Sequence, residues 1–316
     1  MIKVGVCSWT ERTLVRESDF YPRGTKTPEG MLKHYASEFP IVEADAGFYR
    51  LSSEDNAVKW AERTPRGFTF NVKAFRAFTL HPTQPQAIPS DLLDQLPQGL
   101  KDKKSLYWHD LPQAIQDELL ERFRQAQRPL HFGRKLGAIL VQFPKWVFPS
   151  IEARDQLVRL KTAWPDYRIA VEFRDVSWVS EKNLAETMSF LKANELTYVC
   201  VDEPQLARTL PPIARVTTPN LAIVRFHGRN AETWNKKVDT AAERFDYRYA
   251  ADELREWVPR LTELADNAGE VHALMNNCYR DYGVQSARQL TEVLAQAARD
   301  KLVMVAPTPQ QQTLLA

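Results

Sequence analysis

Eight short apolar segments, most of them followed by a stretch with helical periodicity, are the feature that most limits how this chain can fold. Strand-length apolar runs that alternate with amphipathic helices are typical of parallel β/α units. We therefore expect strands at 2–8, 41–45, 67–74, 136–143, 168–173, 196–201, 221–227 and 271–275. The main helices are expected at 27–39, 54–63, 112–128, 149–163, 181–194, 251–267 and 286–299.

The number of these units and the chain length of 316 residues favour a closed (β/α)8 barrel. Such barrels commonly have roughly 250 residues and become longer through insertions. The alternative is a doubly wound open sheet, which usually carries a glycine-rich phosphate turn after its first strand. Here that position holds Cys7, Ser8, Trp9 and Thr10, so the sequence favours the α/β barrel of the TIM type.

Two stretches depart from the regular alternation. Residues 76–112 contain prolines at 82, 85, 89 and 97, which predicts an inserted loop with at most one short helix after the third strand. Residues 202–220 contain four prolines, so no long helix is expected before the seventh strand. We interpret 1–306 as one domain and 307–316 as a polar tail.

Charge and cysteine content limit the classes of partner. Lys and Arg together number 42 against 40 for Asp and Glu, so the overall charge favours neither nucleic acid nor a membrane surface. The three cysteines, at 7, 200 and 278, form no closely spaced pair of the disulfide or zinc type. Strand-like sequence begins at Ile2, and no apolar run approaches the roughly 18 residues of a membrane span. We expect a cytoplasmic protein without a membrane partner.

Polar residues enter each predicted strand close to its end. Side chains alternate along a strand, so if Val224 and Phe226 face the helices, Arg225 and His227 point into the barrel. Active sites of such barrels lie at the carboxyl ends of the strands. The same parity directs inward Cys7, Glu43, Asp45, Asn71, Lys73, Gln142, Glu172, Arg174, Asp202 and Asn276.

These side chains predict a site for an anionic small molecule, phosphorylated or nucleotide-like. Arg174, Arg225 and Arg229 can grip phosphate or carboxylate through bidentate hydrogen bonds, and Gly228 can let backbone N–H groups approach an anion. The remaining candidates for substrate binding are Gln142, Asn276, Trp9, Tyr49 and Trp178. Trp9, Tyr49 and Trp178 belong to a larger set of aromatic residues in the loops after the strands, which also includes Phe48 and Trp146.

Four of these residues are candidates for the chemistry of a hydrolase or lyase. Glu172 or Glu43 could serve as general base, and His227 as acid or base. Lys73 could instead be a Schiff-base nucleophile if the substrate has a carbonyl group.

Three alternatives compete with this interpretation. A hydrolase or isomerase that depends on Mg²⁺ or Mn²⁺ would take its ligands from Glu43, Asp45, Glu172, Asp202 and His227. A non-catalytic module could bind nucleic acid or sugar through the aromatic residues, although the nearly neutral charge disfavours nucleic acid. The arginines and carboxylates could also simply close the top of the barrel. The sequence indicates neither the substrate nor the oligomeric state.

Short motifs at the ends of the predicted strands are spread over most of the chain. They are Gly5 to Trp9, Phe20 to Pro22, Val42-Glu43 with Phe48 to Arg50, Thr64-Pro65 with Phe68 to Lys73, Val141 to Pro144, Val171 to Arg174 with Ser177-Trp178, Val201-Asp202, Val224 to Arg229 and Asn276-Asn277. Together these motifs resemble the YecE-like family, also called domain of unknown function 72. The resemblance implies a (β/α)8 barrel and supplies no reaction. The sequence departs from the family pattern after Asn277, where Cys278 to Asp281 stand in place of an acidic residue and glycines that relatives often carry.

Overall fold

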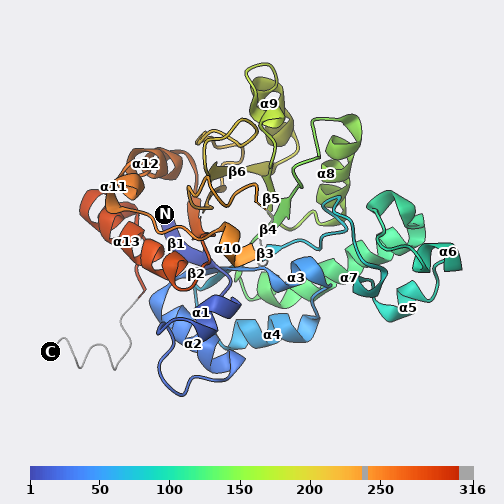
Figure 1. The fold of residues 1–316 in the computed structure, drawn as a ribbon, viewed down its shortest axis with the longest axis horizontal. Helices are drawn as coiled ribbons and strands as arrows, with labels where there is room; N and C mark the ends of the chain where they lie inside the picture. Colours follow the sequence, from blue (N-terminus) through green and yellow to red (C-terminus); the bar gives the residue numbers. More distant parts are fainter. Residues whose placement is uncertain (237–240, 306–316) are drawn as a thin grey trace. The chain divides into compact units, whose positions relative to one another are not determined.

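The computed structural model describes residues 1–236 and 241–305 and contains a closed barrel of eight parallel strands in the order β1 to β8 (Figure 1). This confirms the predicted fold class. The strands are β1 (Ile2–Cys7), β2 (Ile41–Ala44), β3 (Thr69–Lys73), β4 (Leu136–Gln142), β5 (Ile169–Glu172), β6 (Leu196–Asp202), β7 (Leu221–Phe226) and β8 (Glu270–Met275).

The register of neighbouring strands brings their polar ends to matching levels. Cys7 of β1 pairs with Glu43 of β2, and Gln142 of β4 pairs with Glu172 of β5. Gly5 is required where β1 meets β2, because a Cβ atom there would lie 2.1 Å from the backbone oxygen of Ile41. All residues of β6 and β7 are buried, as expected for parallel strands covered on both faces.

Most helices begin and end close to the predicted residues. The α2 helix has Pro28 at its first position, and the Thr27 hydroxyl caps it by accepting from the Gly30 N–H. Ser150 caps α8 in the same way through the Ala153 N–H. The longer helices are α2 (Pro28–Glu38), α4 (Glu54–Glu62), α7 (Gln113–Phe132), α8 (Ile151–Ala163), α9 (Leu184–Ala193), α12 (Val258–Asn267) and α13 (Tyr282–Ala297).

The single helix predicted over 251–267 is wrong. The structure has α11 (Ala251–Arg255) and then α12, with the fully buried Trp257 at the break. Pro259 accounts for the new start, because proline lacks an N–H and is tolerated in the first turn of a helix. Figure 1 shows α11, α12 and α13 side by side.

The stretch at 76–112 holds more structure than predicted. It contains two short α-helices, α5 (Ser90–Leu93) and α6 (Gln98–Lys101), where at most one was expected. Two 3₁₀ turns, at Pro85–Ala87 and Trp108–Asp110, accompany them. Between β6 and β7 no helix interrupts the chain, as predicted for that described segment.

Packing divides the chain into two compact units. The first unit comprises residues 1–43, 62–69 and 197–316, and the second comprises 44–61 and 70–196. The assignment of 1–306 to a single domain stays a prediction, and the tail at 307–316 lies outside the described residues. None of the described helices is both long enough and apolar enough to cross a membrane.

Candidate functional site

In the first unit, Arg225 is the centre of a buried polar cluster. Both Arg225 and Glu43 have 0% exposure, and Nη2 of Arg225 donates to Oε1 of Glu43 at 2.6 Å. The same nitrogen donates to Oδ1 of Asn276 at 3.1 Å and lies 3.6 Å from Sγ of Cys7. Inward-facing side chains of β1, β2 and β7, and of Asn276 just after β8, therefore meet at one place.

His227 extends this cluster through Asn276. Because Oδ1 of Asn276 accepts from Arg225, its Nδ2 group faces Nδ1 of His227, at 2.8 Å. The amide nitrogen is a donor, so Nδ1 of a neutral His227 accepts and the ring proton is on Nε2. The imidazole packs near Phe245 and Trp234. His227 is thus held in one orientation, with the ring proton of the neutral imidazole on Nε2.

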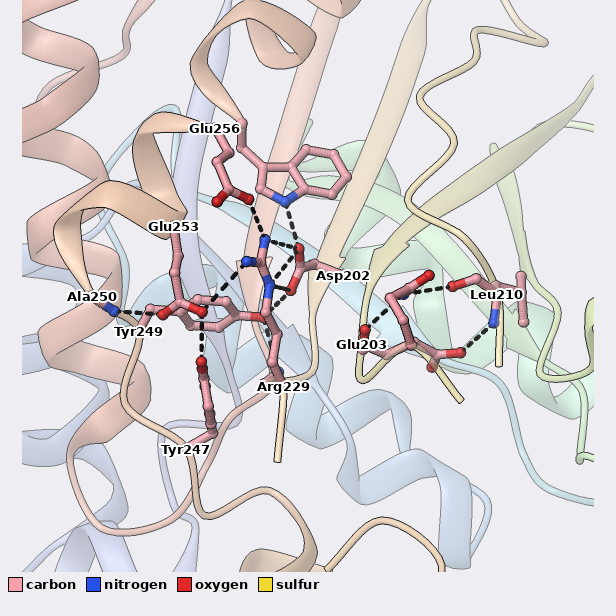
Figure 2. Close-up of polar contacts among 12 residues, drawn as sticks. Asp202, Glu203, Leu210, Arg229, Tyr247, Tyr249, Ala250, Glu253 and Glu256 are labelled. Carbon is pink, nitrogen blue, oxygen red and sulfur yellow. Dashed lines mark hydrogen bonds and ion pairs between the residues drawn. The ribbon is translucent and has the colours of Figure 1, made fainter. Parts of the chain in front are cut away.

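A second cluster of the first unit surrounds Asp202 (Figure 2). Its carboxylate accepts from Arg229 at 2.8 Å, from the Tyr249 hydroxyl at 2.7 Å and from Trp257 Nε1 at 2.6 Å. Arg229 also pairs with Glu256 at 2.9 Å. These hydrogen bonds, that of Asp202 first, raise the pKa of Arg229 above its ordinary value. Arg229 therefore links the segment after β7 to Asp202 of β6 and to Glu253 and Glu256, which lie in α11 and at its end.

Gly228 lies in the same cluster as Arg229 and Tyr249. Its φ is +87°, and a Cβ atom would lie 2.7 Å from Cβ of Tyr247. Its N–H, which was expected to face an anion, instead donates to the Tyr249 hydroxyl at 2.9 Å. The sequence correctly marked Gly228 as a special backbone position, but the hydrogen-bond partner is a side chain of the protein itself.

We expect Gly228→Ala to lower the free energy of unfolding by about 2–3 kcal/mol, because alanine disfavours this φ and its methyl group would collide with Tyr247. Urea denaturation measures the loss. Gly67→Ala is the matched control, since Gly67 has φ +90° and no atom within 4 Å of the added Cβ. Equal losses in both variants would show that the contact with Tyr247 contributes nothing.

In the second unit, two cations lie against one aromatic ring. Nζ of Lys73, at the end of β3, is 4.6 Å from the centre of the Phe48 ring, and Cζ of Arg76 is 5.6 Å from it. The His81 ring is 5.0 Å from the same ring. The backbone N–H of Arg76 donates to the backbone oxygen of Phe48, and the backbone N–H of His81 donates to the backbone oxygen of Arg76. We call Phe48, Lys73, Arg76 and His81 the Phe48 cluster.

Among the described residues, no carboxylate neutralises the charges of Lys73 and Arg76. In the described part of the chain neither residue has a carboxylate within 4.0 Å, and the buried Nε of Arg76 has no hydrogen-bond partner. Arg174 of the same unit, in contrast, pairs with the fully buried Glu172 at 2.8 Å. Partly buried cations without counterions are unfavourable, so an anionic ligand bound beside them would offset this cost.

The charges of Lys73 and Arg76 affect the pKa of His81. Burial, reinforced by Lys73, Arg76 and Arg174, lowers the pKa of His81 to about 3. The Thr79 hydroxyl contacts the Arg76 oxygen at 3.1 Å and Nδ1 of His81 at 2.8 Å. If the hydroxyl proton goes to the carbonyl, Nδ1 carries the ring proton and Nε2 is the acceptor. The imidazole is then neutral at ordinary pH.

The turn that presents His81 is strained. Leu80, between Thr79 and His81, has a φ of +62°, which a branched side chain rarely adopts. Such strain persists where the surroundings hold it and is concentrated at functional sites. Sequence patterns did not single out Arg76 or His81, because both follow β3 at the start of the stretch interpreted as an insertion.

The aromatic residues predicted to bind substrate differ in how much of each side chain is exposed to solvent. Trp178 has 0% exposure, stacks on Phe173 and donates from Nε1 to the Val147 oxygen, so it cannot offer a face to a ligand. Trp9 is also buried. Tyr49 is 62% exposed. The burial of Trp178 and Trp9 favours a packing role, and substrate binding by these two residues stays a prediction.

The predicted metal ligands do not assemble within the described residues. There, no group of three or more His, Cys, Asp or Glu side chains is arranged to hold a metal ion. Arg225 contacts Glu43, and Arg229, Tyr249 and Trp257 surround Asp202. Asp45 stands half-buried at the start of α3 (Ala46–Tyr49).

The fold and these clusters define a (β/α)8-barrel protein with charged side chains at the ends of its strands. The chain belongs to the family described as "Protein of unknown function DUF72", whose sequence pattern matches residues 3–313. It is 32% identical over 298 residues to the UPF0759 protein YunF of Bacillus subtilis (strain 168), covering 93% of this chain and 95% of YunF.

Solved structures of the family agree with the fold. A DUF72 family protein of Enterococcus faecalis V583 is 26% identical and superimposes with a TM-score of 0.74, over 93% of this chain and 95% of that chain. One from Thermotoga maritima MSB8 is 28% identical, with a TM-score of 0.72, over 93% and 99%. These likenesses establish the barrel and name no reaction.

Proposed function

We propose that the protein is an enzyme that acts on a phosphorylated small molecule and binds its phosphate at Lys73 and Arg76. The observation that carries the proposal is that these two neighbouring cations lack carboxylate partners among the described residues. Each of the three arginines that the sequence predicted to bind the anion has such a partner: Arg174 has Glu172, Arg225 has Glu43, and Arg229 has Asp202.

The chemistry of the two cations suits phosphate. The guanidinium of Arg76 can donate two parallel hydrogen bonds to phosphate oxygens, while Lys73 adds a compact charge. Both side chains are half-buried, so their attraction for an anion is screened less than on an open surface. Arg174 strengthens the field, since it contributes to the lowered pKa of His81.

The reaction class we propose is hydrolysis or elimination by acid–base catalysis. Glu172, which belongs to the same unit as Lys73 and Arg76, is the candidate base. Glu43 and His227 belong to the first unit, and their roles as base and acid stay predictions from the sequence. Lys73 as a Schiff-base nucleophile is an alternative role that needs a carbonyl substrate. Arg225 and Arg229 are assigned to orienting Glu43 and Asp202, while direct contacts to substrate stay a prediction for them.

The metal-dependent alternative has less support from the donor set. A Mg²⁺ or Mn²⁺ site needs several carboxylate oxygens free to converge. Asp202 already accepts hydrogen bonds from three side chains, and Glu43 one from Arg225. Nucleic-acid or sugar binding without catalysis has no specific observation in its favour.

The test is calorimetry with inorganic phosphate and sulfate on wild type, Lys73→Gln and Arg76→Gln. We expect each substitution to weaken phosphate binding at least about tenfold, which corresponds to roughly 1.4 kcal/mol. Arg122→Gln is the control, because Arg122 pairs with Asp91 and Glu118 on the surface and should bind as wild type does. Equal affinity in wild type and both cluster variants, or no binding at all, would contradict the proposal.

A further inference from the structure

We infer that the phosphorylated ligand carries a planar ring, as a nucleoside monophosphate does, and that this ring stacks on Trp146 beside the Phe48 cluster. The inference rests on the proposed phosphate site and names the class of ligand bound there.

The exposure of Trp146 is the first observation. All eight tryptophans lie in the described part of the chain, and Trp146 is the one classed as exposed, at 55%. A large aromatic surface left in water gains free energy when a ligand covers it. Trp146 lies in the loop after β4, so it is close in the sequence to a carboxyl end of the barrel.

The position of Trp146 is the second observation. Its ring centre is 6.0 Å from that of His81, and the rings meet at 74°, so they do not stack on each other. The His81 ring centre in turn is 5.0 Å from that of Phe48, and the cationic groups of Lys73 and Arg76 lie over the Phe48 ring. Successive ring contacts through His81 and Phe48 thus connect the exposed indole to the two cations.

Another exposed aromatic residue flanks the cluster. Tyr49 is 62% exposed and meets Phe48 edge to face at 5.1 Å. Exposed aromatic rings beside cations are suited to bind nucleotides, because the phosphate can pair with the cations while the base stacks on a ring. Inorganic phosphate or an aliphatic phosphate would use the cations alone and leave Trp146 uncovered.

The experiment compares AMP, ribose 5-phosphate and inorganic phosphate by calorimetry. We expect AMP to bind wild type about 10- to 100-fold more tightly than ribose 5-phosphate, which is the usual worth of stacking one base. Trp146→Ala should remove this difference, and Trp146→Phe should restore most of it. AMP should also quench tryptophan fluorescence in wild type, and this quenching should be lost in Trp146→Phe.

Phe132→Ala is the matched control, because Phe132 is also an exposed aromatic residue, at 70%, but lies at the end of α7. It should keep the preference for AMP. If ribose 5-phosphate binds as tightly as AMP, and Trp146→Ala changes neither, the inference is overturned while the phosphate site stands. If none of the three ligands binds, the proposed function fails and this inference with it.

Discussion

Replacing either member of the buried pair Arg225–Glu43 is expected to lower the free energy of unfolding by about 3–5 kcal/mol. Both side chains have 0% exposure, and their 2.6 Å hydrogen bond offsets part of the cost of removing two charges from water. Glu43→Leu leaves a buried guanidinium, and Arg225→Met leaves a buried carboxylate. Chemical denaturation of each variant measures the loss.

The double variant Glu43→Leu with Arg225→Met is expected to lose much less than the sum of the two single losses. Apolar side chains in place of a buried ion pair leave no unpaired charge, and such replacements are often nearly neutral. Arg122→Met is the surface control, where the exposed pair with Asp91 should contribute less than about 1 kcal/mol. Additive losses in the double variant would mean that the two charges do not stabilise each other.

The second large expected effect is a loss of stability at low pH, caused by protonation of His81. The pKa of His81 is about 3 in the folded protein, against an ordinary value of 6.5. Between these values the unfolded chain binds more protons than the folded protein, so stability falls as the pH falls from 6.5 toward 3. Above pH 6.5 the group is neutral in both states and has no effect.

The measurement is the difference in stability between wild type and His81→Asn as a function of pH. From pH 7 to pH 4 wild type should lose on the order of 1–3 kcal/mol more than the variant, after allowance for solvent screening of the partly exposed ring. Asparagine keeps a donor toward Thr79, so the comparison isolates the charge. Parallel curves would show that His81 titrates normally.

Ligand binding should oppose this effect. Burial is the largest cause of the lowered pKa of His81, and the charges of Lys73 and Arg76 add to it. A phosphate held by these two cations would neutralise their charges, so the pKa of His81 should rise on binding. Titration of the His81 ring by NMR, with and without phosphate, reports the change. No rise in the presence of saturating phosphate would place the anion elsewhere.

Local sequence patterns were sufficient for the barrel and for the direction of many side chains. Strand length, apolar content and helical periodicity depend on residues that are neighbours in the chain, so the eight strands and most of the helices between them could be recognised directly. Because side chains alternate with a period of two, parity correctly brought Arg225, Glu43 and Asn276 together. Periodicity alone did not show the break before α12, which is marked by Pro259 in the first turn of that helix.

The tertiary structure alone decided which cations are available to a ligand. By sequence, Arg174, Arg225 and Arg229 looked equally suited to bind an anion, and Arg76 was not distinguished. Ion pairing depends on which carboxylates lie within about 4 Å, and in this chain those carboxylates come mostly from other strands and helices. The charge that remains at Lys73 and Arg76, and its effect on His81, therefore follows from distances and burial that exist only once the chain has folded.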